Sequence, residues 1–421
     1  MSLFDRFADK VFKRGDVTII FATGEQRRYG TPEAGLKPVT LRFADKGVPL
    51  FIGRNPGLHA AEAFMDGRLI IEQGDIRDLI ETVRTNGNWE DKKRGASTLR
   101  GVFFDRIKDS VGATIGAVNG IARSKQNVAH HYDLNDRLYD LFLDADRQYS
   151  CAYFTDPANG LEQAQMDKKA HIAAKLHLKP AQRVLDIGCG WGGMALYLNR
   201  AADVDVLGIT LSEEQLKVAR ARAEAAGVAD RVKFELIDYR LLNDRFDRIV
   251  SVGMFEHVGT PHYDTFFAKC RDLLAEDGVM LLHTIGRLGV RGKTDAFTLK
   301  YIFPGGYNPA LSEIVESSEK ARLIASDVEN LRYHYGLTLD LWYDRTVAAK
   351  DAIVALYDER FYRMWTFYLA GARAAFFHGN LCNYQIQYIR NRRTLPIMRD
   401  YMAEVEADLP RVTVSPPGKS V

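Results

Sequence analysis

The segment Arg183–Gly193, RVLDIGCGWGG, constrains the fold of this 421-residue chain more than any other stretch. Its apolar residues 184–187 form a short strand, and a helical run at Met194–Asn199 follows a turn that contains four glycines. Glycine is needed where a bound molecule approaches the backbone closely or where φ is positive. The segment therefore predicts a strand, a turn and a helix whose free N–H groups face a ligand.

The chain after this segment alternates between strand and helix patterns. Strands are predicted at VDVLGIT, VKFELID, DRIVSVGMF and VMLLHTI, and helices over Glu213–Ala226 and Tyr263–Ala275. This alternation predicts an α/β fold in which helices cover both faces of a parallel, Rossmann-like sheet. Ligands of such folds bind beyond the carboxyl ends of the strands.

The N-terminal part of the chain predicts a small α+β domain. The apolar residues of the first 12 positions lie on one face of a short helix, which suits core packing better than insertion into a lipid interface. The stretches VTIIFATGEQRRYG and VTLRFADKGVPLFIG predict paired strands with glycine-containing turns. Helices are predicted over Ala60–Met65 and Asp75–Val83, with the strand RLIIEQ between them.

Composition excludes several classes of protein. The formal net charge of +2 does not indicate a nucleic-acid partner. The four cysteines are scattered, with no CxxC or HExxH motif, so we expect a reducing compartment, no disulfides and no metal. No apolar run is long enough to span a membrane, and Asp5 and Asp9 interrupt the N-terminal apolar pattern of a secretory signal. We predict a cytoplasmic protein.

The second strand after the glycine turn separates two classes of cofactor. NAD-binding domains place an acidic residue at its end, about 20 residues past the glycines, to bind the ribose. Here the polar groups are Thr210, Ser212 and Gln215, which are neutral but can still bond a ribose. Asp238, at the end of the third strand, can accept a hydrogen bond from an adenine amino group. The pattern favours S-adenosylmethionine over NAD.

Three ionisable residues lie at the ends of the next strands. Glu256 and His257 follow the fourth strand, and His283 ends the fifth. These side chains form either a general-base pair or a structural hydrogen-bonded pair, and their position beside the predicted cofactor site favours a function. Aromatic residues in QYSCAYF and HYGLTLDLW suit an apolar substrate or a developing cation, although a core has the same composition.

Together these motifs resemble the cyclopropane-fatty-acid synthase family, which includes the mycolic acid cyclopropane synthases. The shared segments are HYDLND, QYSCAYF, VLDIGCGWGG, GITLS, FEHVG, VMLLHTI, YIFPGG and HYGLTLDLW, in the family's order within residues 126–393. The resemblance implies a class I S-adenosylmethionine-dependent methyltransferase with a seven-stranded sheet and helical insertions. It also implies transfer of a methylene to the cis double bond of an unsaturated phospholipid acyl chain.

The resemblance also implies that bound bicarbonate accepts the proton released when the ring closes. The matching catalytic positions are Cys151, Glu256, His283, Ile285 and Tyr335. The predicted cofactor-binding residues are Tyr149, Ser150, Asp186, Gly188, Gly190, Gly192, Thr210, Ser212, Gln215, Asp238, Tyr239 and Gly253.

The predicted organisation has four parts. The small domain covers 1–90 and assists lipid engagement or dimer contacts, a linker with an amphipathic helix covers 91–125, the catalytic domain covers 126–409, and a flexible tail covers 410–421. We expect peripheral contact with the inner face of the membrane and no nucleic-acid partner. Whether the protein forms a homodimer is left open.

Three alternative functions remain open at this point. A fatty-acyl C-methyltransferase would give a methyl-branched or methylated unsaturated chain from the same first step. A small-molecule N- or O-methyltransferase would show little dependence on lipid vesicles. A lipid-binding protein without activity should have lost Glu256, His283 or Tyr335, all of which are present.

Overall fold

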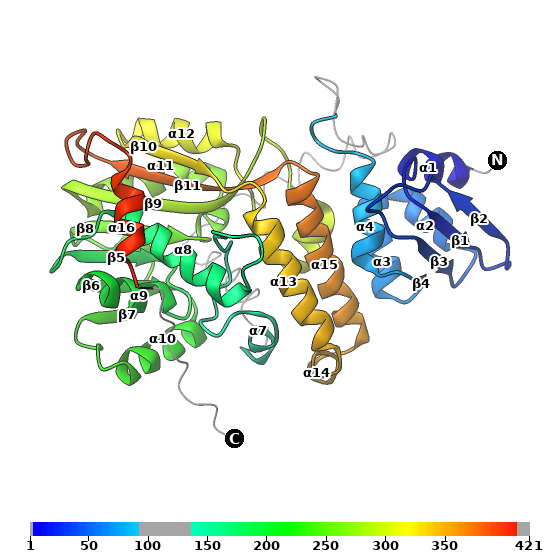
Figure 1. Ribbon diagram of the computed structural model, residues 1–421, viewed down its shortest axis with the longest axis horizontal. Helices are drawn as coiled ribbons and strands as arrows, with labels where there is room; N and C mark the ends of the chain where they lie inside the picture. Colours follow the sequence, from blue (N-terminus) through cyan, green and yellow to red (C-terminus); the bar gives the residue numbers. More distant parts are fainter. Residues whose placement is uncertain (1–2, 92–135, 411–421) are drawn as a thin grey trace. The chain divides into compact units, whose positions relative to one another are not determined.

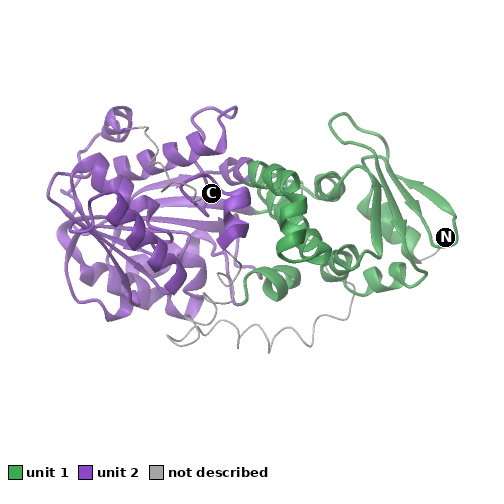
Figure 2. Ribbon diagram, turned by 90° about the horizontal axis from the view of Figure 1, so that it is seen from below, with its two compact units in different colours: residues 1–115, 294–304, 339–380 green, residues 116–293, 305–338, 381–421 purple. Residues whose placement is uncertain are grey.

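The computed structural model describes residues 3–91 and 136–410. The chain divides into two compact units, which Figure 2 colours separately. The first comprises residues 1–115, 294–304 and 339–380, and the second comprises residues 116–293, 305–338 and 381–421. Most of the predicted linker and its helix, and the predicted tail beyond residue 410, lie outside the described residues.

The second unit is built on a seven-stranded sheet with the strand order β10-β11-β9-β8-β5-β6-β7 (Figure 1). Strands β5 to β9 pair in parallel, whereas β11 runs antiparallel to both of its neighbours. This arrangement confirms the predicted α/β, Rossmann-like fold. The strands are β5 (Arg183–Ile187), β6 (Asp205–Thr210), β7 (Val232–Leu236), β8 (Phe246–Val252), β9 (Leu274–Arg287), β10 (Ile324–Asn330) and β11 (Leu381–Ile389).

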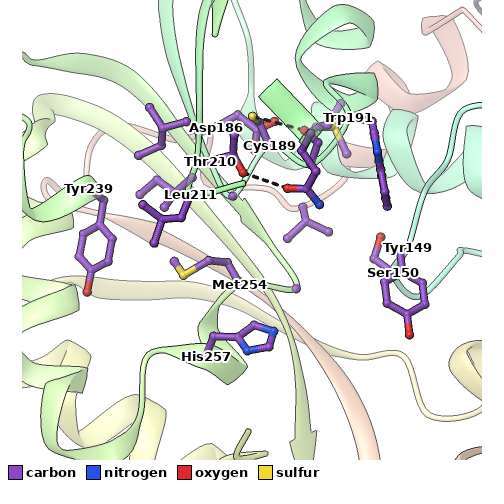
Figure 3. A pocket seen from close by; sticks show the side chains of 18 of the residues that line it. Tyr149, Ser150, Asp186, Cys189, Trp191, Thr210, Leu211, Tyr239, Met254 and His257 are labelled. Carbon is purple, nitrogen blue, oxygen red and sulfur yellow. Dashed lines mark hydrogen bonds between the residues drawn. The ribbon is translucent and has the colours of Figure 1, made fainter. Parts of the chain in front are cut away.

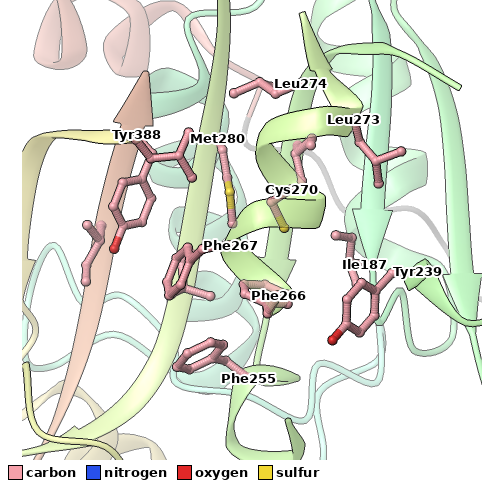
Figure 4. Packing of buried hydrophobic residues seen from close by; sticks show 14 of the residues in the cluster. Ile187, Tyr239, Phe255, Phe266, Phe267, Cys270, Leu273, Leu274, Met280 and Tyr388 are labelled. Carbon is pink, nitrogen blue, oxygen red and sulfur yellow. The ribbon is translucent and has the colours of Figure 1, made fainter. Parts of the chain in front are cut away.

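Alternating residues of β5 enter two different hydrophobic clusters, as the two-residue period of a strand requires. Leu185 and Ile187 belong to a cluster that includes α11, and Figure 4 shows this packing around Phe266 and Cys270. Val184 belongs to a second cluster, formed with α8, α9 and α10. Helices therefore cover both faces of the sheet. The helices of this unit are α7 (Asp136–Phe142), α8 (Leu161–Leu176), α9 (Gly193–Ala202), α10 (Glu213–Ala225), α11 (Tyr263–Leu273), α12 (Leu311–Lys320) and α16 (Tyr401–Asp408).

Two predicted helix boundaries need correction. The helix predicted over Tyr263–Ala275 ends at Leu273, because Leu274 already pairs with Phe246 as the first residue of β9. Helix α9 extends beyond the predicted Met194–Asn199 run and ends at Ala202. The start of β9 sets the first boundary, whereas α9 is ended by Asp203, which caps it in the left-handed conformation.

The first unit contains a four-stranded sheet with the order β2-β1-β3-β4. The predicted hairpin is present as β1 and β2, and the second predicted segment contributes β3, parallel to β1. The VPLFIG part of that segment is a helix rather than a strand, because Pro49 cannot donate to a ladder but suits a first helical turn. The strands are β1 (Val17–Ile20), β2 (Gln26–Tyr29), β3 (Val39–Phe43) and β4 (Leu69–Gln73).

The N-terminal helix α1 packs inward, as the core-packing interpretation predicted. The ring of Phe4 lies edge-on to Phe21 and Phe43, with centroid distances of 5.9 and 5.5 Å. The helices of the first unit are α1 (Leu3–Val11), α2 (Val48–Arg54), α3 (Pro56–Met65), α4 (Ile76–Thr85), α14 (Lys350–Leu356) and α15 (Glu359–Phe377), with the later part of α13 (His334–Ala348).

Helix α15 explains why the two units differ from the predicted domains. Arg373 and His378, in and just after α15, both contact the Glu81 carboxylate of α4, the His378 Nε2 to Glu81 Oε1 distance being 2.6 Å. Residues 339–380 therefore group with the N-terminal sheet and not with the remainder of the predicted 126–409 domain. The sequence pattern shows that a helix has an apolar face but not what that face packs against.

Candidate functional site

The glycine turn after β5 is shaped by close packing as well as by its dihedral angles. Gly188 has φ +84°, and a Cβ at this position would lie 2.8 Å from the Cβ of Met254. A Cβ at Gly192 would lie 2.7 Å from the Phe234 ring. Gly190 has φ +54°, and a Cβ there would meet nothing within 4 Å. Two of these glycines are therefore required by packing, and Gly190 faces open space.

This open space is part of a cavity at the carboxyl ends of β5, β6, β7 and β8 (Figure 3). Its position agrees with the rule that ligands of open α/β sheets bind beyond the strand ends. Besides the glycine turn, the lining residues are Arg147, Gln148, Tyr149, Ser150, Asp186, Ile187, Trp191, Met194, Ile209, Thr210, Leu211, Gln215, Ile237, Asp238, Tyr239, Arg240, Val252, Gly253, Met254, His257 and Val258.

Most of the predicted cofactor-binding residues line this cavity. They are Tyr149, Ser150, Asp186, Gly188, Gly190, Thr210, Gln215, Asp238, Tyr239 and Gly253. The two exceptions have structural roles. Gly192 packs beneath Phe234, and the Ser212 hydroxyl accepts a hydrogen bond from the Gln215 N–H at 3.3 Å as the N-cap of α10.

The β6 end of the cavity is polar and uncharged. The Thr210 hydroxyl donates to Gln215 Oε1 at 2.9 Å and accepts from the Ser212 N–H at 3.1 Å. Asp238, at the β7 end, accepts from Arg240 Nε at 2.8 Å and Nη2 at 2.6 Å. The sequence did not reveal Arg240, which orients this carboxylate and also donates its backbone N–H to Asp238 Oδ1 at 3.0 Å. A carboxylate has acceptor sites beyond those that Arg240 uses, so Asp238 can still bind a further donor.

The β5 end of the cavity contains a buried carboxyl group. Burial raises the pKa of Asp186 to about 7, and its Oδ2 atom forms no hydrogen bond with the described residues. His257 also lines the cavity, and burial lowers its pKa to about 4, so its ring is neutral near pH 7. Asp186 is thus a buried acceptor suited to a cationic group.

Four of the predicted catalytic residues fall into two pairs beside the cavity, one joined by a direct hydrogen bond and the other by a hydrogen bond between chain neighbours. Glu256 Oε1 accepts from the Ile285 N–H at 2.6 Å, whereas Glu256 Oε2 is buried and forms no hydrogen bond with the described residues. Burial raises the pKa of Glu256 to about 7. The Ala152 N–H, next to Cys151, donates to the Thr338 hydroxyl at 3.0 Å, one turn along α13 from Tyr335.

Gly253 lies between these two pairs. Its N–H donates to the His283 carbonyl at 2.9 Å, and a Cβ built on it would be 4.0 Å from Ser150 Cβ. None of Cys151, Glu256, His283, Ile285 and Tyr335 is among the lining residues of the cavity, but their chain neighbours Ser150 and His257 are. The five residues therefore do not line this cavity, and of the consecutive residues Glu256 and His257 only His257 does.

The ring of His283 is held by two amide side chains from β11. Lys175 Nζ donates to Gln385 Oε1 at 2.9 Å, so Gln385 Nε2 is the donor to His283 Nδ1 at 3.1 Å. His283 therefore carries its proton on Nε2. The amide of Asn383 has its Nδ2 3.1 Å from this atom, and since two donors cannot pair, rotation of the amide by 180° would bring its unpartnered Oδ1 into place as the acceptor. Burial lowers the pKa of His283 well below its usual value, so the ring is neutral.

A group of buried charges beside the cavity was not found from the sequence. Asp146 accepts from Lys169 Nζ at 2.6 Å, from Gln148 Nε2 at 3.1 Å and from Arg222. Lys168 donates to Gln148 Oε1 at 2.7 Å and to Ser150 Oγ at 2.8 Å. Lysines in a helical run usually indicate a solvated face, and no local signal distinguishes these.

Comparisons with known proteins match the larger part of the chain. The profile of the mycolic acid cyclopropane synthetase family matches residues 121–386. Cyclopropane-fatty-acyl-phospholipid synthase of Escherichia coli K12 is 47% identical over 260 residues, which are 62% of this chain and 66% of that protein. The chain thus spans slightly less than two thirds of the length of that relative.

Two further relatives extend this comparison. The probable fatty acid methyltransferase Rv3720 of Mycobacterium tuberculosis is 35% identical over 390 residues, which are 86% of this chain and 91% of that protein. The crystal structure of mycolic acid cyclopropane synthase CmaA1, complexed with SAH and CTAB, superposes with a TM-score of 0.60 at 35% identity. It covers 63% of this chain and 97% of CmaA1.

Proposed function

Because the chain belongs to the mycolic acid cyclopropane synthetase family, we propose that it transfers a methylene from S-adenosylmethionine to the cis double bond of an unsaturated phospholipid acyl chain. The observation that carries this proposal is the cavity, which has a neutral β6 end, an acceptor for adenine at Asp238 and a buried acceptor at Asp186. These features fit an adenosine at one end and an α-ammonium group at the other.

The reaction determines what the protein groups must do. S-adenosylmethionine supplies an electrophilic methyl group when it is bound. An alkene has no acidic proton to remove before methyl transfer, so the first step needs alignment and exclusion of water rather than a base. Transfer leaves a positive charge on the acyl chain, and loss of a proton from the new methyl group closes the ring.

We assign the proton-removal site to the two linked pairs beside the cavity, with bicarbonate as the proton acceptor. The buried Oε2 of Glu256 supports this assignment, because it is a polar atom that needs a partner. The pKa of Glu256, raised to about 7, lets it keep a proton near neutrality and donate to an anion. The Ile285 N–H and the nitrogens of His283 are already hydrogen-bonded within the protein.

The substrate would reside in a bilayer, so the proposal includes peripheral contact with the membrane. None of the helices in the described ranges, 3–91 and 136–410, has the length and apolar character needed to cross a bilayer. The names of relatives such as Rv3720 favour one second candidate, a fatty-acyl C-methyltransferase that performs the same first step.

A single labelling experiment distinguishes these outcomes. The protein is incubated with vesicles of an unsaturated phospholipid and with S-adenosylmethionine whose methyl group carries three deuterons, and the acyl chains are then analysed by mass spectrometry. Ring closure takes one deuteron from the transferred methyl, so a cyclopropane retains two. A chain that loses the proton from its own carbons retains all three. An exocyclic methylene also retains two, so ozonolysis of the product, which cleaves an alkene but not a cyclopropane, completes the assay. Absence of any vesicle-dependent transfer would refute the lipid substrate and favour a small-molecule methyltransferase.

The same assay tests the proton acceptor. Glu256→Gln should leave the affinity for S-adenosylhomocysteine unchanged and lower turnover, because Glu256 lies outside the cofactor cavity. Added bicarbonate should stimulate protein that has been depleted of carbonate. No response to bicarbonate would make a side chain the acceptor, and unchanged turnover would remove Glu256 from the site.

A further inference from the structure

Three lysines of α8 are buried, and one of them differs from the others in its partners. Lys169 pairs with Asp146 at 2.6 Å, and Lys175 pairs with Glu329. Lys168 is 0% exposed, yet it forms no ion pair with a carboxylate among the described residues. Its two direct partners, Gln148 Oε1 and Ser150 Oγ, are neutral oxygens. A buried cation is costly unless an anion compensates it, and among the described residues no anion is in direct contact with Lys168.

Both neutral partners of Lys168 line the cavity. Gln148 is fixed in orientation, because its Nε2 donates to Asp146 at 3.1 Å while its Oε1 accepts from Lys168. Lys168 has no acceptor atom, so Ser150 Oγ must accept the hydrogen bond between them. The hydroxyl proton of Ser150 is therefore available to an acceptor elsewhere, and the cavity lies beside it.

The place of Ser150 in the cavity indicates which acceptor it meets. Figure 3 shows Tyr239, the neighbour of Asp238, on the side of the cavity opposite Tyr149 and Ser150. An adenosine held at Asp238 would therefore direct its amino-acid portion towards Ser150 and Asp186. That portion carries one ammonium and one carboxylate, and the buried acceptor Asp186 accounts for the ammonium alone.

We propose that Lys168, acting through Ser150, is a positioning residue that prepares this end of the cavity for the carboxylate of the bound cofactor. The inference rests on the proposed function, because it requires a cofactor with an amino-acid portion. The anion that Lys168 lacks would then arrive with the ligand. Ser150 would donate the hydrogen bond to it, and the buried ammonium group would stabilise its charge from behind.

The charges around Lys168 give this proposal a pH dependence. The groups that act on it are Asp144, Asp146, Lys169 and Cys151, and Lys168 in turn acts on Asp186 and His283. Burial lowers the pKa of Lys168 to about 7, and the nearby carboxylates offset part of this effect. A bound carboxylate raises the pKa again. Carboxylate binding should therefore weaken as the pH rises above 7, where the free protein loses the Lys168 proton.

Two ligands that differ only in the carboxylate test the proposal. Dissociation constants are measured by calorimetry for S-adenosylhomocysteine and for its decarboxylated analogue, which keeps the amine. The readout is the ratio of the two dissociation constants. Both ligands carry the amine, so the contribution of Asp186 to binding the amine cancels in this ratio. Wild-type protein should prefer S-adenosylhomocysteine, and Lys168→Met should reduce that preference about tenfold or more. The control is Lys175→Met, a buried lysine of the same helix whose partners do not line the cavity.

Each outcome has one meaning. No binding of S-adenosylhomocysteine to wild-type protein would refute the proposed function itself. Wild-type binding with an unchanged ratio in Lys168→Met would overturn the role of Lys168 alone, as would an equal loss in Lys175→Met. If Lys168→Met does not fold, Lys168→Gln, which removes the charge and keeps a polar side chain, is measured in its place, and an unchanged ratio in that variant would overturn the proposal.

Discussion

The two sides of the cofactor cavity are built by different physical means. The glycine turn, 188–193, forms its side from backbone, with positive φ angles and contacts that exclude a Cβ. A second side, residues 147–150, is held in place by buried charges from α8 and α10, which act partly through Asp146. We call the first side the glycine wall and the second side the charged wall. The glycine wall is specified by its own residues, whereas the charged wall needs partners that are distant in the sequence. The first can be predicted from a motif, and the second becomes visible only in the fold.

The charged wall should be the more sensitive to a single substitution. Asp146→Ala leaves Lys169 and Arg222 buried without their shared carboxylate, which typically costs about 3–5 kcal/mol. We expect a large fall in the midpoint of thermal or denaturant unfolding. The control is Asp140→Ala, which removes an exposed partner of Arg147 and should cost less than about 1 kcal/mol. Equal effects of the two substitutions would mean that the charged wall is not organised as described.

The glycine wall can be tested with a matched pair of substitutions. Gly188→Ala combines φ +84° with a 2.8 Å contact to Met254, whereas Gly190→Ala has φ +54° and no contact. The strain at Gly190 alone should cost roughly 1–2 kcal/mol in unfolding free energy, and Gly188→Ala should cost more because of the contact. Both should weaken binding of S-adenosylhomocysteine in calorimetry. A Gly190→Ala protein that binds normally would show that the open space beside Gly190 is not the cofactor site.

Glu256, which belongs to neither wall, allows a third test based on the pH dependence of stability. Glu256 has a pKa raised to about 7 by burial, so the folded state holds its proton more tightly than the unfolded state between about pH 4 and 7. The contribution of Glu256 to the free energy of unfolding therefore falls as the pH rises through that range. Glu256→Gln removes the effect, and the variant should gain roughly 3 kcal/mol relative to wild type between pH 5 and 8. If the unfolding free energies of wild type and Glu256→Gln change with pH in parallel, the raised pKa of Glu256 is contradicted.

The smallest expected effect concerns a residue that the sequence placed in the cavity and the structure places in a helix cap. Ser212→Ala should cost about 1 kcal/mol in unfolding free energy, because it removes the N-cap of α10. The affinity for S-adenosylhomocysteine should change less than about twofold, well below 1 kcal/mol. A large loss of affinity for S-adenosylhomocysteine without loss of stability would show that Ser212 contacts the cofactor after all.

The features that could be predicted share a local cause. The glycine turn, the alternating strands and the polar residues at the strand ends follow from periodicity and backbone geometry, and they located most of the cavity. The missed features depend on tertiary partners. Lys168 meets Gln148 and Ser150, and α15 packs with the N-terminal unit. The error at VPLFIG is different, because Pro49 was a local signal for a helix start.

The central claim is that the cavity takes a molecule with adenosine at the β7 end and an amino-acid group at the end formed by Asp186 and Ser150. A crystal structure of the protein with S-adenosylhomocysteine tests this claim most directly. We predict the adenine amino group beside Asp238, the ammonium beside Asp186 Oδ2 and the carboxylate within hydrogen-bond distance of Ser150 Oγ. A ligand bound away from Gly188 and Gly190, or bound in the reverse direction, would contradict the account.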